Sequence, residues 1–113
     1  MRVIVAGSRT IDSYKLVEEA ILKSGIQPTE IVSGTARGVD RMGELWAAVN
    51  GVPVKRFPAD WRRNGASAGH IRNTQMAEYA EALVAVWDGS SPGTKHMIGV
   101  AKHKGLEVFV SSK

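Results

Sequence analysis

The chain contains no cysteine, few aromatic residues and no long apolar run. Without cysteine, its 113 residues form no disulfide, offer no thiol nucleophile and hold no Cys-ligated metal. The amino-terminal apolar stretch covers only Val3–Ala6, far less than a secretory signal or a membrane span requires. We therefore expect a soluble, cytoplasmic protein with no membrane partner.

Glycine and positive charge, by contrast, are plentiful. The 12 glycines exceed the roughly 7% of an average protein, so the backbone must turn sharply or approach something closely at several points. A formal net charge of +4 and a pI of about 9.7 favour an anionic partner. Charge alone does not decide between a nucleotide, a nucleic acid and an acidic membrane surface.

Apolar runs alternate with helical patterns along the whole chain. Continuous apolar runs at 3–6 and 82–87 predict two strands buried on both faces, and shorter or mixed runs predict strands at 31–32, 52–57 and 106–110. The spacing between them predicts helices from Asp12 or Ser13 to Gly25 and over 39–51, 66–80 and 93–104. Val49 and Ile71 are expected on buried helix faces, and residues 58–64 are expected to form a loop.

This alternation predicts one Rossmann-like α/β domain over residues 1–113, with a five-stranded parallel sheet between two helical layers. The two fully apolar strands belong in the centre and the mixed strands at the edges, which gives the order 3-2-1-4-5. The order reverses between the strands that end at Gly7 and Asp88, and ligands bind at such switch points.

Three loops at the carboxyl ends of these strands are rich in glycine and hydroxyl groups. Their backbone N–H groups and the helices that follow favour a phosphate, and arginine and lysine side chains add full charges. The glycines could instead serve only to make tight turns between strand and helix. We predict a phosphate site that contains Gly7, Ser8, Arg9, Ser33, Gly34, Arg37, Gly38, Asp40, Asp88, Gly89, Ser91, Gly93, Thr94, Lys95 and His96. The absence of a Walker P-loop and of GxGxxG disfavours an ordinary kinase or dehydrogenase.

Several motifs in these loops resemble those of one superfamily. Ser33–Asp40 (SGTARGVD) resembles the SGGARGAD-type motif of the SLOG superfamily, and residues 89–96 (GSSPGTKH) resemble its GxxxGTxH-type motif. Residues 5–9 and the middle segment with FPADW and IRN are similar to its YspA-type, cpYpsA-related branch. The resemblance covers almost the whole chain and implies a Rossmann-like domain that binds nucleotides or nucleotide-derived ligands. It also favours Arg72 and Asn73 as site residues, and Thr35 departs from the usual glycine.

The same resemblance bears on catalysis. The Lonely Guy phosphoribohydrolases of this superfamily cleave a base from a nucleoside monophosphate with an arginine and a glutamate. Arg72 is similar to that arginine, but the glutamate is replaced near His96, so the hydrolase chemistry does not transfer. If the chain is an enzyme, we expect nucleotide N-glycosidic hydrolysis with Asp88, Arg72 and His96 as candidate catalytic residues. No cofactor is expected to be required, and the histidines lack the spacing of metal ligands.

Three functions therefore stay open: a ligand sensor or ligand-processing module, a hydrolase, and a binder of single-stranded nucleic acid. The third rests on the similarity of Ser33–Asp40 to the corresponding segment of DNA-processing protein A. The lysines and arginines form no basic run interleaved with aromatics, which favours a small-molecule nucleotide derivative over nucleic acid. Trp61 is expected either to stack on a base or to cover the core, and Asp40 either to contact a ribose hydroxyl or to hold Arg37. Pairing of two copies stays open.

Overall fold

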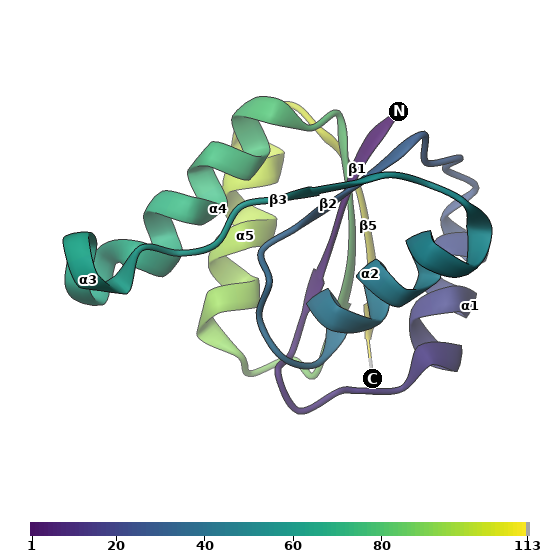
Figure 1. The fold of residues 1–113 in the computed structure, drawn as a ribbon, viewed down its shortest axis with the longest axis horizontal. Coiled ribbons are helices and arrows are strands. Elements are labelled where there is room, and N and C mark those ends of the chain that lie inside the picture. The colour runs from purple at the N-terminus through teal and green to yellow at the C-terminus, as the bar shows by residue number, and fades with distance from the viewer. Residues whose placement is uncertain (113) are drawn as a thin grey trace.

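The computed structural model describes residues 1–112, in which five parallel strands alternate with helices (Figure 1). The strands are β1 (Arg2–Gly7), β2 (Glu30–Ser33), β3 (Val54–Arg56), β4 (Ala82–Trp87) and β5 (Glu107–Ser112). They lie in the order β3-β2-β1-β4-β5, which confirms the predicted order. Because every pairing is parallel, the carboxyl ends of all the strands lie at one edge of the sheet.

Helices cover both faces of the sheet, as the sequence predicts (Figure 1). Helices α1 (Tyr14–Ser24) and α2 (Val39–Asn50) lie on one face, and α4 (Ala68–Tyr79) and α5 (Pro92–His103) lie on the other. The short helix α3 (Trp61–Asn64) and the 3-10 turn η1 (Gly65–Ser67) lead into α4 and project away from the sheet. Among the described helices, none combines the length and the apolar character that crossing a bilayer requires.

Alternate residues of the central strands supply two separate core layers. On β1, Val3 and Val5 pack in the layer under α1 and α2, whereas Ile4 and Ala6 pack in the layer under α4 and α5. Successive side chains of a strand point to opposite faces, so continuous apolar runs are what a doubly covered sheet requires. With both faces covered, the polar loops at the edge of the sheet are left to form a site.

Gly43 determines which side of α2 faces the sheet. A Cβ at Gly43 would lie 2.8 Å from Val5 Cγ1, so the helix backbone packs directly against β1. This close approach turns Gly43 and Ala47 inward. The prediction that Val49 faces the core is therefore wrong, because its side chain is 67% exposed.

The segment before α4 also differs from the prediction. The expected loop at 58–64 contains α3, which Asp60 caps by accepting a hydrogen bond from Arg63 N at 3.0 Å. The prediction of Ile71 as a buried residue is wrong, since its side chain is 39% exposed. The buried face of α4 carries Asn73 and Met76 instead, and this rotation directs a polar side chain toward the carboxyl ends of the strands.

Candidate functional site

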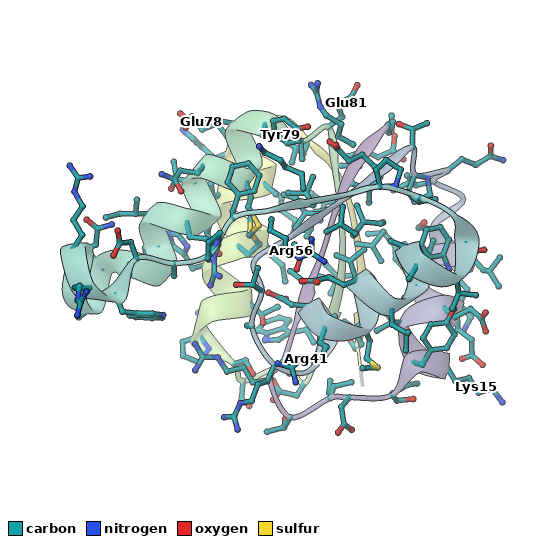
Figure 2. All side chains as sticks on the ribbon, in the orientation of Figure 1. Lys15, Arg41, Arg56, Glu78, Tyr79 and Glu81 are labelled. Carbon is teal, nitrogen blue, oxygen red and sulfur yellow. The ribbon has the colours of Figure 1, made fainter. Side chains whose placement is uncertain are left out.

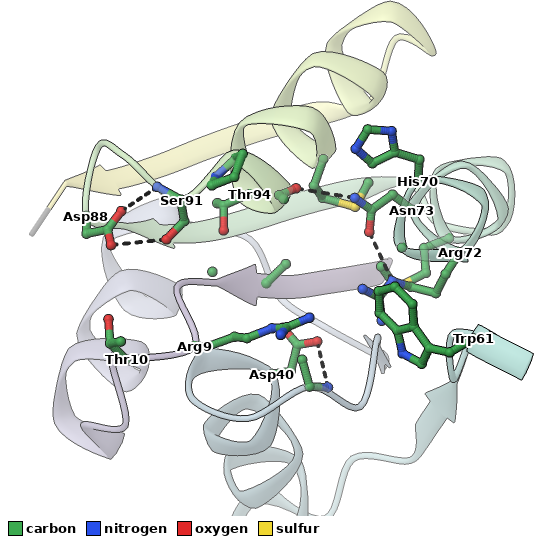
Figure 3. Close-up of a pocket in the computed structure, with 18 of the residues that line it drawn as sticks. Arg9, Thr10, Asp40, Trp61, His70, Arg72, Asn73, Asp88, Ser91 and Thr94 are labelled. Atoms are coloured by element: carbon green, nitrogen blue, oxygen red, sulfur yellow. Dashed lines mark hydrogen bonds between the residues drawn. The ribbon is translucent and has the colours of Figure 1, made fainter. Parts of the chain in front are cut away.

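The two ends of the sheet are built differently. At the end where the strands begin, the Tyr79 hydroxyl donates to the Glu30 carboxylate, and Arg2 N donates to Glu81 Oε1 at 2.9 Å (Figure 2). At the end where the strands finish, a crevice of about 450 Å³ lies between the end of β1, the loop after β4 and the helices α2, α4 and α5 (Figure 3). The predicted site residues that line this crevice are Gly7, Arg9, Asp40, Arg72, Asn73, Asp88, Ser91, Gly93 and Thr94.

Two glycines allow the loops around the crevice to meet. A Cβ on Gly7 would lie 2.0 Å from the carbonyl oxygen of Val86. Gly38 has a φ of 76°, and a Cβ there would lie 2.4 Å from the carbonyl oxygen of Ser8. Side chains other than hydrogen have no room at either position, so these glycines serve backbone packing first.

Ser8 joins the loop after β1 to the loop after β4. Its side chain is buried, and its Oγ accepts a hydrogen bond from Asp88 N and is hydrogen-bonded to Ser91 Oγ, both at 3.1 Å. Ser8 therefore lies behind the crevice as a support and does not line it. The sequence predicts Ser8 as a ligand contact, but the structure leaves its buried side chain no free surface for a ligand.

Asp40 is a buried carboxylate at the start of α2. Its Oδ2 accepts a hydrogen bond from Ala36 N at 3.2 Å. Burial raises the pKa of Asp40 to about 6, against the Ala36 hydrogen bond and the charges of Arg72 and Arg9, which lower it. Within residues 1–112 no hydrogen bond joins Asp40 to Arg37, so the carboxylate holds the loop backbone and not that arginine.

Arg9 and Arg72 bring positive charge into the crevice. Arg72 is partly buried; its Nη1 donates to the carbonyl oxygen of Gly34, and its Nε donates to Asn73 Oδ1 at 3.0 Å. Burial lowers the pKa of Arg72 from its ordinary value. Arg9 extends from the end of β1 toward Asp40 (Figure 3). Neither arginine forms an ion pair within 4.0 Å in the described part of the chain.

Asn73 connects α4 to α5 at the side of the crevice. Besides accepting from Arg72, it donates through Nδ2 to the carbonyl oxygen of Gly93 at 3.3 Å and lies 3.1 Å from His96 Nδ1. These partners satisfy a polar group that would otherwise be costly to bury. Asn73 thereby fixes the orientation of Arg72 relative to the start of α5.

His96 lies outside the crevice. Its ring stacks on His70 with centroids 3.8 Å apart, and it lines an outer cavity together with Lys95. Burial lowers the pKa of His96, and the neighbouring His70 acts in the same direction. The candidate catalytic residues Asp88 and Arg72 therefore share the crevice, whereas His96 does not line it and contacts two residues that do, Asn73 and His70.

Asp88 organises the loop in which it lies. Its Oδ1 accepts hydrogen bonds from Ser90 N and Ser91 N, both at 2.9 Å, and its Oδ2 accepts one from Ser91 Oγ at 3.0 Å. The hydrogen bond from Ser90 N, followed by that from Ser91 N, lowers the pKa of Asp88 to about 2. The carboxylate thus stabilises its own turn, the structural role that an aspartate before Gly89 commonly has.

Helix α5 begins at this turn and keeps free amides at its first residues. No side chain caps it, and Pro92 occupies its first turn. Within residues 1–112, the amides of Gly93 and Thr94 have no acceptor. The free N–H groups and the partial positive charge of a helix start favour an anion, and these two residues line the crevice.

The remaining predicted residues lie beside or behind the crevice. Ser33 Oγ donates to Glu44 Oε2 at 2.7 Å and accepts from Thr35 N at 3.1 Å, while Arg56 Nε donates to Glu44 Oε1 at 3.0 Å. Glu44 is therefore engaged in a network away from the crevice. The predicted residues that do not line the crevice are Ser8, Ser33, Gly34, Arg37, Gly38, Gly89, Lys95 and His96.

The role of Trp61 was left open by the sequence, and Gly69 was not among the predicted site residues. Trp61 is 53% exposed and lines the crevice; it does not belong to either core layer. The Trp61 ring packs against α4 at Gly69, where an added Cβ would lie 3.6 Å from the ring. The ring lies beside Arg72 (Figure 3). Met76 and Met97 add apolar surface nearby. A signal for Gly69 existed, because it precedes Asn73 by one helical turn.

The fold and the crevice define a Rossmann-like α/β domain whose candidate site lies at the topological switch point of the sheet. Residues 1–64 match the YspA, cpYpsA-related SLOG family. The chain belongs to this family, which confirms the resemblance seen in its motifs. It is also 32% identical over 118 residues to the Gene 61 protein of Mycobacterium phage D29, covering 96% of this chain and 94% of the phage protein.

A solved structure extends the likeness of fold. The chain is similar to the X-ray structure of DNA processing protein A from Streptococcus pneumoniae, with a TM-score of 0.74 and 20% sequence identity. The similarity covers 96% of this chain and 49% of the other, so this chain spans about half the length of that protein. At this identity the likeness establishes the fold.

Proposed function

We propose that the protein binds a phosphate-bearing, nucleotide-derived small molecule in the crevice at the carboxyl ends of β1 and β4. The observation that carries this proposal is the convergence of two arginines and an uncapped helix on one cavity. Arg9 and Arg72 have no ion pair among residues 1–112, and the amides of Gly93 and Thr94 have no acceptor there. Guanidinium and helix-start N–H groups are the donors that phosphate favours.

The rest of the crevice suits a nucleoside. Its volume of about 450 Å³ falls in the range of roughly 300–1,000 Å³ that small-molecule sites occupy. The half-exposed ring of Trp61 offers a face for stacking, and Met76 and Met97 offer apolar contact. A phosphate held by the arginines and α5 leaves the base free to reach this side.

The carboxylates favour binding over turnover. Asp88 uses both oxygens for its own turn, and Asp40 accepts from Ala36 N while buried beneath the loop. Hydrolysis of a glycosidic bond needs a carboxylate that can activate water or stabilise positive charge. Asp88 is engaged in its own turn and Asp40 is buried near the charges of Arg72 and Arg9, so a sensor or ligand-binding role accounts for the site better.

The proposal is tested by calorimetric titration with AMP and ADP-ribose, using Arg9→Gln as the variant. Arg9 is exposed and makes no hydrogen bond within residues 1–112, so its replacement should leave the fold intact. Loss of one charge-assisted contact should weaken binding by on the order of tenfold. Lys15→Gln removes the same charge from the exposed side of α1 and should change nothing.

Two further measurements separate the other functions. Chromatography of the AMP mixture for free adenine tests hydrolysis, and titration with a short single-stranded oligonucleotide at two salt concentrations tests nucleic-acid binding. Binding of the oligonucleotide alone, with a steep loss at high salt, would contradict the small-molecule proposal because phosphate-backbone binding releases counterions.

A further inference from the structure

A second cavity adjoins the crevice and is lined by three arginines. It has a volume of about 370 Å³ and shares Arg9, Ala36, Trp61 and Arg72 with the crevice. Its outer wall consists of residues 34–37 after β2 and residues 58–59 after β3, and this wall contributes Arg37. We refer to this second cavity as the arginine compartment.

The two cavities differ in charge. Asp40 and Asp88 line the crevice, whereas no carboxylate is among the described residues that line the arginine compartment. Arg37 is exposed and has neither a hydrogen bond nor an ion pair in residues 1–112. Three guanidinium groups around one space favour an anion there, and Arg37, which has no partner in residues 1–112, can bind it in bidentate fashion.

The crevice also offers an anion position that does not belong to the arginine compartment. That position is the start of α5, where Gly93 and Thr94 present free amides. The arginine compartment does not include any residue of α5. Trp61 lines both cavities, so its ring offers a surface on which a base can stack beside either of them.

We propose that the ligand is a nucleotide with two separate phosphate groups, as in a nucleoside 3′,5′-bisphosphate. One phosphate occupies the start of α5, and the other occupies the arginine compartment at Arg37. This inference rests on the proposed function and specifies the ligand of the same site. A nucleoside diphosphate carries the same number of phosphates, but both belong to one chain on one ribose oxygen, whereas those of a 3′,5′-bisphosphate leave the ribose at two places, as two separate anion positions favour.

The test is a calorimetric comparison of adenosine 3′,5′-bisphosphate, ADP and AMP. The unaltered chain should bind the bisphosphate on the order of tenfold more tightly than either of the other two, as an additional charge-assisted contact predicts. Arg37→Gln should abolish this preference while the affinity for AMP stays the same. Lys15→Gln, in the first turn of α1 (Figure 2), is the matched control because Lys15 lines neither cavity, and it should keep both.

The outcomes separate the two levels of the proposal. Equal affinity of the unaltered chain for all three nucleotides would overturn the two-phosphate inference and leave the proposed function standing. An equal loss of AMP and bisphosphate binding in Arg37→Gln would also overturn it, because a single phosphate would then occupy the arginine compartment. If none of the three binds, the proposed function itself fails.

Discussion

The segments that follow β2 and β4 each contribute an aspartate to the crevice, but the two carboxylates have opposite surroundings. At the start of α2, which follows the loop after β2, burial raises the pKa of Asp40 to about 6. In the loop after β4, Asp88 is exposed and its pKa is lowered to about 2, first by the amides of Ser90 and Ser91. Burial thus disfavours the charged form of Asp40, whereas the amides of its own turn favour the charged form of Asp88.

The glycines of the two loops show the same contrast and give the largest expected effect. Gly38 (φ 76°) meets the Ser8 backbone, whereas Gly89 (φ 87°) has nothing within 4 Å of the place where a Cβ would lie. Gly38→Ala should therefore lose about 3–5 kcal/mol of unfolding free energy, from backbone strain plus steric overlap. Gly89→Ala should lose only about 1–2 kcal/mol, from strain alone. Urea denaturation of both variants measures the difference, and equal losses would contradict it.

The second prediction concerns how stability depends on pH. The pKa of Asp40 is about 6 in the native state and 3.8 at its ordinary value, so the native state binds more protons between these values. Stability contributed at this site is therefore lost as pH rises from about 4 to about 6. Over that window the unaltered chain should lose about 3 kcal/mol relative to Asp40→Asn. Denaturation curves at pH 4 and pH 7 measure this change, and parallel pH profiles would contradict it.

Asp88→Asn provides the control of opposite sign. Because the pKa of Asp88 is lowered to about 2, its carboxylate stabilises the native state above its ordinary value of 3.8. That stabilisation is lost as pH falls toward 2. The unfolding free energy of the unaltered chain should thus exceed that of Asp88→Asn by less in acid than at neutral pH. In the comparison with Asp40→Asn, the unaltered chain should instead be less stable at neutral pH, and this difference should disappear in acid.

The smallest expected effect concerns Thr35, which has a φ of 65° in the loop after β2. A β-branched residue in this left-handed region is strained, and asparagine tolerates it better. Thr35→Asn should raise the unfolding free energy by up to about 1 kcal/mol, with Thr10→Asn as an exposed control from the loop after β1. A loss of stability in Thr35→Asn, measured by urea denaturation, would show that the threonine side chain makes a compensating contact.

The strand order follows from the sequence because burial leaves a direct mark on composition. Only strands covered on both faces, such as Val3–Ala6, can be apolar without interruption, and this places them in the centre of the sheet. The loops at the carboxyl ends were likewise predictable, since topology alone brings them together. The family motifs then pointed to Arg72 and Asn73, both of which line the crevice.

The orientation of α4 was harder to predict because its buried face includes a polar residue. A search for apolar residues favours Ile71, yet Asn73 is the residue that is buried. Counting back one turn from Met76 and Ala77 does reach Asn73, so the periodicity held the signal. The sequence could not identify the hydrogen-bond partners that offset the cost of burying Asn73. These partners are the Gly93 carbonyl and the Arg72 guanidinium.

The crevice exists only when both helical layers are packed on the sheet, because each layer contributes residues to its lining. Asp40 comes from the layer of α1 and α2, whereas Asn73 and Thr94 come from the layer of α4 and α5, and the sheet is what the two layers share. Opening of either layer would dismantle the cavity, so a molecule that occupies it binds only the fully assembled chain. Mass action then couples occupancy to global unfolding, and the melting temperature should rise with ligand concentration.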